Sequence, residues 1–295
     1  MTFISEMTLK VKKYAIIAIV LMIYSASFRV LANETVIGKN DKIPVDLQLL
    51  LAVDVSQSID EDEARLQRDG YLQALKDPDI IDIIKSGYHG RIALSYMEWA
   101  GPLQQWLLVN WQIVDSEVTA QDFANRLVSA PIRMGQRTSI SFAILHAISI
   151  FRDSEYSSIR KVIDISGDGA NNAGFYVHET RHRAVENGIT INGLAILNTR
   201  PSPIGIPATK HIDNYYEDCV IAGPGAFIVV AEKLESFSAA VRRKMILEIA
   251  ALSHNGVDHK DVRTGMDVAL VNANFQTTDC LIGEKQLELY KNLKP

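Results

Sequence analysis

The feature that most constrains this fold is an almost unbroken apolar run, Val-Asp-Leu-Gln-Leu-Leu-Leu-Ala-Val, at residues 45–53. Such a run is typical of a strand that is buried on both faces of a parallel sheet, because a strand with one wet face alternates apolar and polar side chains. The run ends at Asp54. A helical pattern follows from Asp60 to about Leu75, with acidic residues in its first turn, where the helix dipole favours anions. These residues predict a strand–loop–helix unit.

Strand and helix patterns alternate along the rest of the chain, apart from a Pro- and Gly-rich loop at 198–225 and a tail at 253–295 with weak signals. This alternation predicts an α/β fold with a doubly wound, mostly parallel central sheet flanked by helices. The predicted strands after the first are 91–99, 106–114, 161–165, 189–197 and 226–231, and the later helices are 119–128, 139–151, 176–187 and a last one ending near 252.

The first 32 residues have the three-part layout of a secretory signal. Lys10, Lys12 and Lys13 precede an apolar run, and Ala32 completes a site of small residues. The run is about 15 residues long, which is short of the roughly 20 that a helix needs to cross a bilayer, although an uncleaved anchor is the alternative. We therefore expect residues 1–32 to be a signal peptide that is removed, and the protein to be exported to the periplasm or secreted.

After residue 32 we expect a linker at 33–45, one domain at 46–252 and a C-terminal extension at 253–295. Removal of residues 1–32 takes away four basic residues and one acidic residue, which leaves 26 basic and 34 acidic residues and a formal net charge of -8. This acidic balance argues against nucleic-acid binding. No other apolar stretch is long enough to insert into a membrane.

The only two cysteines are Cys219 and Cys280. An oxidising compartment would permit them to pair, but nothing in the sequence shows that they meet, so the pairing stays open.

Polar residues follow the predicted strands at the edge where ligands bind in open parallel sheets. Asp54, Ser56 and Ser58 alternate after the first strand, Thr138 opens the helix at 139–151, and Asp168 follows the strand at 161–165. This all-oxygen set suits a hard cation such as Mg²⁺ or Mn²⁺. A divalent ion that is only partly neutralised can attract a carboxylate from a partner. The alternative is that the hydroxyls cap helices and that Asp168 is a turn residue.

These residues resemble the metal-ion-dependent adhesion site (MIDAS) of von Willebrand factor A (VWA) domains, which combines an Asp-x-Ser-x-Ser loop with a distant Thr and a distant Asp before Gly. Asp54-Val55-Ser56-Gln57-Ser58, Thr138 and Asp168-Gly169 match it. The resemblance covers roughly 46–252, and the chain is also similar to bacterial exported proteins of the domain-of-unknown-function 1194 group. It implies a Rossmann-like, VWA-type fold. It also implies that the two Ser and the Thr coordinate Mg²⁺, directly or through water, with both Asp close to the ion.

One departure from the family wording is Ser166-Gly167-Asp168, where Thr-Asp-Gly is more usual. It leaves the roles of Ser166 and Asn171 open. Asn171 and Asn172 could be auxiliary partners of the site or simple turn formers, and we favour turn formers.

A competing signal is His178-Glu179-Thr180-Arg181-His182, which fits the His-Glu-x-x-His pattern of zinc hydrolases. No third ligand follows at a known spacing, and a solvated helix face explains the same residues. The dinucleotide-binding glycine motif and the hydrolase nucleophile elbow are both missing from the sequence. We therefore predict no catalytic residues and favour a binding module whose metal takes an acidic group of a protein partner. A zinc metallohydrolase is the alternative.

Three tryptophans, Trp99, Trp106 and Trp111, fall in predicted strands and are expected to fill core.

Overall fold

The computed structural model describes residues 42–198, 208–233, 236–250 and 278–293. The expected signal peptide at 1–32 and most of the expected linker lie outside the described residues, as does the first part of the C-terminal extension. Within the described part of the chain, no helix has the length and apolar character needed to cross a membrane.

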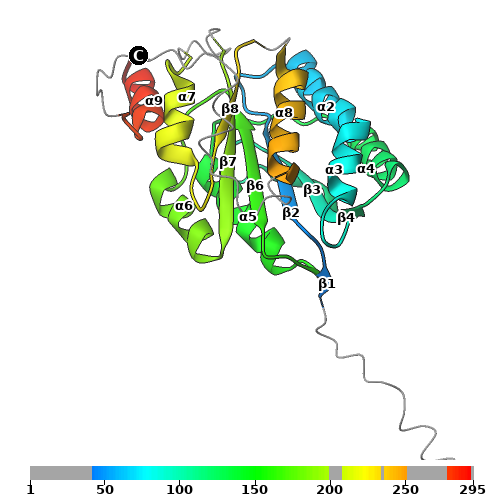
Figure 1. Ribbon diagram of the computed structural model, residues 1–295. Helices are drawn as coiled ribbons and strands as arrows, with labels where there is room; N and C mark the ends of the chain where they lie inside the picture. Colours follow the sequence, from blue (N-terminus) through cyan, green and yellow to red (C-terminus); the bar gives the residue numbers. More distant parts are fainter. Residues whose placement is uncertain (1–41, 199–207, 234–235, 251–277, 294–295) are drawn as a thin grey trace, which may run out of the picture. The chain divides into compact units, whose positions relative to one another are not determined.

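The core of the fold is a six-stranded sheet with the strand order β4-β3-β2-β6-β7-β8 (Figure 1). All neighbouring strands pair in parallel except β4, which pairs antiparallel with β3 at one edge. This confirms the predicted mostly parallel α/β sheet. The strands are β2 (Gln48–Asp54), β3 (Ile92–Trp99), β4 (Gln105–Val114), β6 (Lys161–Gly167), β7 (Ile189–Ile196) and β8 (Ile228–Ala231).

Helices cover both faces of the sheet and form two separate apolar clusters. The cluster on one face takes in α2 (Glu61–Leu75), α3 (Pro78–Lys85), α4 (Glu117–Ser129) and α8 (Phe237–Ala250). The cluster on the other face takes in α5 (Ile140–Arg152), α6 (Val177–Glu186), α7 (Ile212–Tyr215) and the short π-helix η2 (Tyr216–Val220), with the start of α9 (Ile282–Leu293) packed against it.

Strand β2 lies at the centre of the sheet and is buried along its whole length. Successive side chains of a strand point to opposite faces, so Leu49 and Leu51 join one cluster while Leu50 and Ala52 join the other. The unbroken apolar run is therefore explained by helices on both sides. The polar turn after β2 leads to Asp60, whose carboxylate accepts a hydrogen bond from the Glu63 amide and starts α2 as a capping box.

Several elements were not predicted from the sequence. Helix α3 follows α2 directly, helices α7 and η2 lie inside the long loop, and α9 lies in the C-terminal tail. Strand β1 (Ile43–Pro44) pairs with β5 (Tyr156–Ser157), so part of the segment expected to be linker forms a strand.

The tryptophans follow the core prediction only in part. Trp99 is fully buried, whereas Trp106 and Trp111 are partly exposed. The reason is that Trp106 and Trp111 lie on β4, the edge strand of the sheet, where one side has no neighbouring strand.

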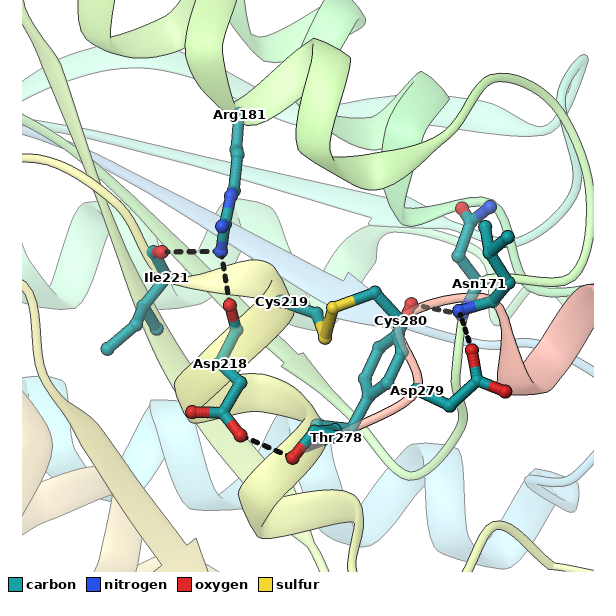
Figure 2. The surroundings of a disulfide bond; sticks show 10 residues. Asn171, Arg181, Asp218, Cys219, Ile221, Thr278, Asp279 and Cys280 are labelled. Atoms are coloured by element: carbon teal, nitrogen blue, oxygen red, sulfur yellow. Dashed lines mark hydrogen bonds between the residues drawn. A yellow bond between two sulfur atoms is a disulfide. The ribbon is translucent and has the colours of Figure 1, made fainter. Parts of the chain in front are cut away.

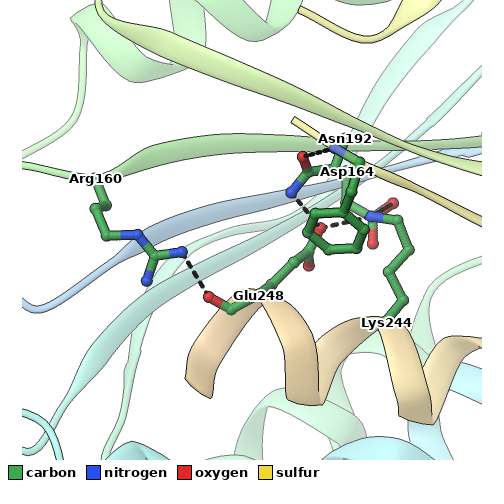
Figure 3. A network of polar contacts seen from close by, with 6 residues as sticks. Arg160, Asp164, Asn192, Lys244 and Glu248 are labelled. Carbon is green, nitrogen blue, oxygen red and sulfur yellow. Dashed lines mark hydrogen bonds and ion pairs between the residues drawn. The ribbon is translucent and has the colours of Figure 1, made fainter. Parts of the chain in front are cut away.

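A buried ion network lies between α8 and the sheet (Figure 3). Lys244 Nζ is 2.6 Å from Asp164 Oδ1 and 2.5 Å from Glu248 Oε1, and the Lys244 side chain has no exposed surface. Asn192 donates to Glu248 Oε1 at 3.1 Å, and the guanidinium of Arg160 donates to the Glu248 carbonyl oxygen at 2.7 Å. Ion pairs and hydrogen bonds of this network therefore link α8 to β6 and β7, in addition to their apolar contacts.

The two cysteines form a disulfide, with a Cα–Cα distance of 5.5 Å. The bond joins η2, which contains Cys219, to Cys280, two residues before α9. The sequence left open whether the two cysteines pair, and they do so because the C-terminal tail packs against η2.

Candidate functional site

The turn after β2 gathers two hydroxyls beside a carboxylate. Asp54 is the last residue of β2, and its Oδ1 accepts a hydrogen bond from the Ser56 amide at 2.7 Å. Ser56 Oγ and Ser58 Oγ lie 3.3 Å apart. The alternate spacing of Asp54, Ser56 and Ser58 thus lets one tight turn present three oxygen-bearing side chains in one place.

Thr138 joins this group from the start of α5. Its hydroxyl lies 3.4 Å from Ser56 Oγ. Asn172 holds the Thr138 backbone in place through two hydrogen bonds. Its side-chain oxygen accepts from the Thr138 backbone amide at 2.9 Å, and its backbone amide donates to the Thr138 carbonyl oxygen at 2.8 Å. Arg137, the residue before Thr138, has a φ of 72°, a left-handed conformation that non-glycine residues seldom adopt. The loop is therefore held in an unfavourable conformation directly beside the hydroxyl.

Asp168 completes the cluster from the loop after β6. Its Oδ1 accepts a hydrogen bond from Ser58 Oγ at 2.6 Å, and its Oδ2 accepts from the side-chain amide of Asn198 at 2.8 Å. The structure thus brings all the predicted site residues together at the carboxyl ends of β2 and β6. Asn198 lies just after β7, and the sequence analysis did not select it.

Both carboxyl groups of the cluster are buried, and burial favours their neutral forms. Burial, together with the nearby Asp168 charge, raises the pKa of Asp54 well above its ordinary value, against the hydrogen bonds from Ser56. Burial also raises the pKa of Asp168, against the hydrogen bonds from Ser58 and Asn198. A cation bound between two such carboxyl groups would stabilise their charged forms.

One oxygen of the cluster has no hydrogen-bond partner in the part of the chain that the structure describes. Asp54 Oδ2 is buried and receives no hydrogen bond from any residue that the structure describes, and the same holds for the nearby hydroxyl of Tyr216. An ideal Cβ on Gly167 would lie 2.8 Å from Asp54 Oδ2 and 2.6 Å from Tyr216 Oη, so only glycine fits between them. An unpaired buried carboxylate oxygen is costly, and a bound cation would remove that cost.

The donor set fits a hard divalent ion. Carboxylate and hydroxyl oxygens are ligands that Mg²⁺ and Mn²⁺ accept, and such ions commonly keep several waters. In the described parts of the chain, no cluster of three or more His, Cys, Asp or Glu side chains is arranged to hold a metal. Any metal at this site therefore depends on its hydroxyls, which is the composition that the sequence predicted.

The two asparagines that follow Asp168 do more than form a turn, which corrects the sequence-based expectation. Asn172 holds Thr138, as described above. Asn171 is fully buried; its side-chain oxygen accepts from the Ser141 amide at 3.1 Å, and its side-chain nitrogen donates to the Phe175 carbonyl at 3.1 Å and to Glu284 at 2.8 Å. No local pattern could have revealed the contacts with Thr138, Ser141 and Glu284, because these residues come from distant segments.

The His-Glu-x-x-His residues lie apart from this cluster on the exposed face of α6. His178, Glu179 and His182 are all exposed. His182 Nε2 lies 3.2 Å from Glu186, and the ring of His178 stacks on Tyr176. These contacts are those of a solvated helix face, and no further described ligand joins them.

The six-stranded, mostly parallel sheet with helices on both faces defines a doubly wound α/β domain. The chain belongs to the family described as "Protein of unknown function (DUF1194)", whose model matches residues 44–253.

Several solved structures are similar to this chain at low sequence identity. The pilus adhesin SpaC from Lactobacillus rhamnosus GG is 12% identical, with a TM-score of 0.52 over 72% of this chain and 32% of SpaC. The mussel-byssus proximal thread matrix protein 1, solved with a zinc-occupied MIDAS motif, is 12% identical, with a TM-score of 0.48 over 72% of this chain and 49% of its own. A von Willebrand factor type A protein from Catenulispora acidiphila is 13% identical, with a TM-score of 0.46 over 70% of this chain and 43% of its own.

This chain thus spans half or less of the length of each of these proteins, and the likeness concerns the fold. No protein of curated function matches the sequence significantly.

Proposed function

We propose that this protein is an exported binding module that uses a divalent cation, Mg²⁺ or Mn²⁺, to bind an acidic group on a protein partner. The observation that carries the proposal is the buried Oδ2 of Asp54, which accepts no hydrogen bond from any described residue and lies in a cluster of hydroxyls and a second carboxylate. The residues that would hold the ion are Asp54, Ser56, Ser58, Thr138 and Asp168.

The composition of the cluster supports partner binding. A bound divalent ion would supply a positive charge that the site neutralises only in part and that a partner's carboxylate can complete. Ser58 is the most exposed of the five residues, so the cluster reaches solvent on its side. The exposed Arg137 beside Thr138 adds a second positive charge at the rim, which favours an acidic partner over a basic one.

The proposal includes no catalytic turnover. The cluster contains no His, Cys or Lys that could serve as base or nucleophile beside its hydroxyls, and the histidines of α6 lie elsewhere. Export is supported by the Cys219–Cys280 disulfide, because such bonds persist in oxidising compartments outside the cytosol.

Calorimetric titration of the metal-stripped protein with Mg²⁺, Mn²⁺ and Zn²⁺ tests the proposal. We expect Mg²⁺ or Mn²⁺ to bind, and Asp54→Asn and Thr138→Ala to abolish or strongly weaken binding. Thr180→Ala is the matched control, because Thr180 is equally buried but bonds only within α6. Tight zinc binding that is lost in His182→Ala would overturn the proposal in favour of a metalloenzyme.

The partner class is tested with synthetic glutamate-containing peptides and matched peptides in which Gln replaces Glu. We expect the glutamate peptides alone to bind, in Mg²⁺ and not in a chelator, and Thr138→Ala to remove this binding. Equal binding of both peptide sets, or binding that persists in the chelator, would count against recognition of a carboxylate through the metal.

A further inference from the structure

The C-terminal helix α9 is fastened beside the loop that carries Asp168, and it lies outside the segment 44–253 that matches the family model. Its anchor is the disulfide from Cys280 to Cys219 in η2 (Figure 2). Thr278 adds a hydrogen bond to the Asp218 carboxylate next to Cys219. We call Thr278–Cys280 together with α9 the C-terminal strap.

The strap contacts the site loop through Asn171, three residues after Asp168. Glu284 in the first turn of α9 accepts from the Asn171 side chain at 2.8 Å. A Cβ built on Gly283 would overlap the backbone carbonyl of Asn171, so the start of α9 lies directly against the loop backbone. The Asn171 amide donates to the hydroxyl of Tyr215 at 3.2 Å, and Tyr215 immediately precedes η2.

The other end of the disulfide also reaches the site. Cys219 lies in the same short helix as Tyr216, whose hydroxyl borders Gly167 close to Asp54 Oδ2. The bond thus joins a segment that contacts Asn171 in the Asp168 loop to a segment whose Tyr216 lies beside Gly167. Without the bond, the strap would be held to the domain by contacts that include the hydrogen bonds of Glu284, Thr278 and Gln286 and the partial burial of α9.

We infer that the C-terminal strap positions the Asp168 loop through Asn171, so that metal affinity depends on the Cys219–Cys280 disulfide. This inference rests on the proposed metal site. Asn171 and Glu284 are positioning residues in it, because they act on the loop and not on the ion. Residues that orient metal ligands from behind typically change metal affinity 10- to 100-fold when they are removed.

Reduction of the disulfide is an ordinary exchange with a dithiol. A thiolate of the reagent attacks one sulfur of the disulfide, which forms a mixed disulfide and releases the other cysteine as a thiolate. The second thiolate of the reagent then attacks the mixed disulfide and releases the first cysteine, while the reagent becomes a cyclic disulfide. Cys280 is only partly buried, so the reagent can reach it. The metal affinity of the site would then follow the oxidation state of its surroundings.

The test compares Mn²⁺ titrations of the oxidised full chain, the dithiol-reduced chain after removal of the reagent under inert gas, and the double variant Cys219→Ser with Cys280→Ser. We expect both disulfide-free forms to bind Mn²⁺ at least about tenfold more weakly than the oxidised protein. Equal affinity in all three forms would overturn the inference and leave the proposed function intact.

The strap contact itself is tested by substitutions at one position. Glu284→Ala removes the acceptor for Asn171 and should weaken Mn²⁺ binding, whereas Glu284→Gln keeps an acceptor oxygen and should retain most of the affinity. Lys285→Ala is the matched control, because Lys285 is an exposed neighbour on α9 that pairs only with Asp279. Equal effects of the two alanine variants would show a general loss of stability and contradict a positioning role.

Hydrogen exchange gives a readout that needs no metal. The Asn171 and Asn172 amides, which bond to Tyr215 Oη and the Thr138 carbonyl, should exchange faster in the disulfide-free forms and in Glu284→Ala. Unchanged exchange at both amides would refute the positioning role. If the oxidised wild type binds no metal, the proposed function fails together with the metal-dependent part of this inference, and the exchange data still decide whether the strap positions the loop.

Discussion

Asp164, in the buried network with Lys244 and Glu248, makes the stability of the fold depend on pH. Burial, followed by the Glu248 charge, raises the pKa of Asp164 to about 7, against the effect of Lys244. A carboxyl group with a higher pKa in the folded state than in the unfolded chain stabilises the fold fully below its unfolded pKa, here 3.8. That contribution is lost as the pH rises through the folded pKa, so it declines between about pH 4 and pH 7.

The size of the loss follows from the two pKa values. One pKa unit corresponds to about 1.4 kcal/mol, and this carboxyl would lose about 2.5 kcal/mol of stabilisation between pH 5 and pH 8. Asp164→Asn keeps the size of the side chain and does not titrate. The free energy of unfolding of this variant should therefore fall less than that of the wild type over the same range, by about that amount.

Urea unfolding at pH 5, 6, 7 and 8, in the presence of a chelator so that no metal contributes, measures this difference. Asp62→Asn is the matched control, because Asp62 is an exposed residue in the first turn of α2 and its variant should follow the wild-type profile. Parallel pH profiles for the wild type and Asp164→Asn would refute the assignment of the raised pKa to Asp164.

Three further predictions concern other contacts of the fold. Lys244→Met leaves two buried carboxylates without their cation and should lower the free energy of unfolding by about 3–5 kcal/mol in urea titrations; a loss below about 1 kcal/mol would show that the network adjusts without the lysine. Gly167→Ala places a methyl group against Tyr216 Oη and Asp54 Oδ2 and should weaken Mn²⁺ binding in calorimetry, with partial recovery when Tyr216→Phe is added, whereas wild-type affinity would exclude the close fit. Replacement of Cys219 and Cys280 by serine opens a cross-link across 61 residues and should cost about 4 kcal/mol in the same urea assay, and an unchanged midpoint would mean that the tail contacts hold without it.

The order of strands and helices was largely predictable because each depends on side chains that are close together in the chain. The apolar run at 45–53 predicted a strand buried on both faces, and β2 is such a strand, with Leu49 and Leu50 in opposite clusters. The edge position of β4 was not predictable, since the pattern at 106–114 is compatible with either an edge or a central strand. The partial exposure of Trp106 and Trp111 follows from that position.

The candidate site was also largely predictable, because the carboxyl ends of parallel strands meet at one edge of a sheet. Asp54 ends strand β2, Asp168 directly follows β6 and Thr138 lies just before α5, and the structure brings them together. The supporting role of Asn171 and Asn172 was considered, but the sequence favoured simple turn formers. Their hydrogen-bond partners, such as Glu284 for Asn171, lie far away in the sequence.

The sequence alone thus determined the strand–helix alternation, the parallel sheet and the residues that converge on the candidate metal site. Periodicity is a local property, and the geometry of a parallel sheet brings strand ends together without any knowledge of long-range contacts. Only the tertiary structure decided that Cys219 meets Cys280, that α9 lies against Asn171, and that Lys244 sits between two buried carboxylates. Each of these contacts joins segments whose approach depends on how whole helices pack, and no local pattern in the chain encodes that packing.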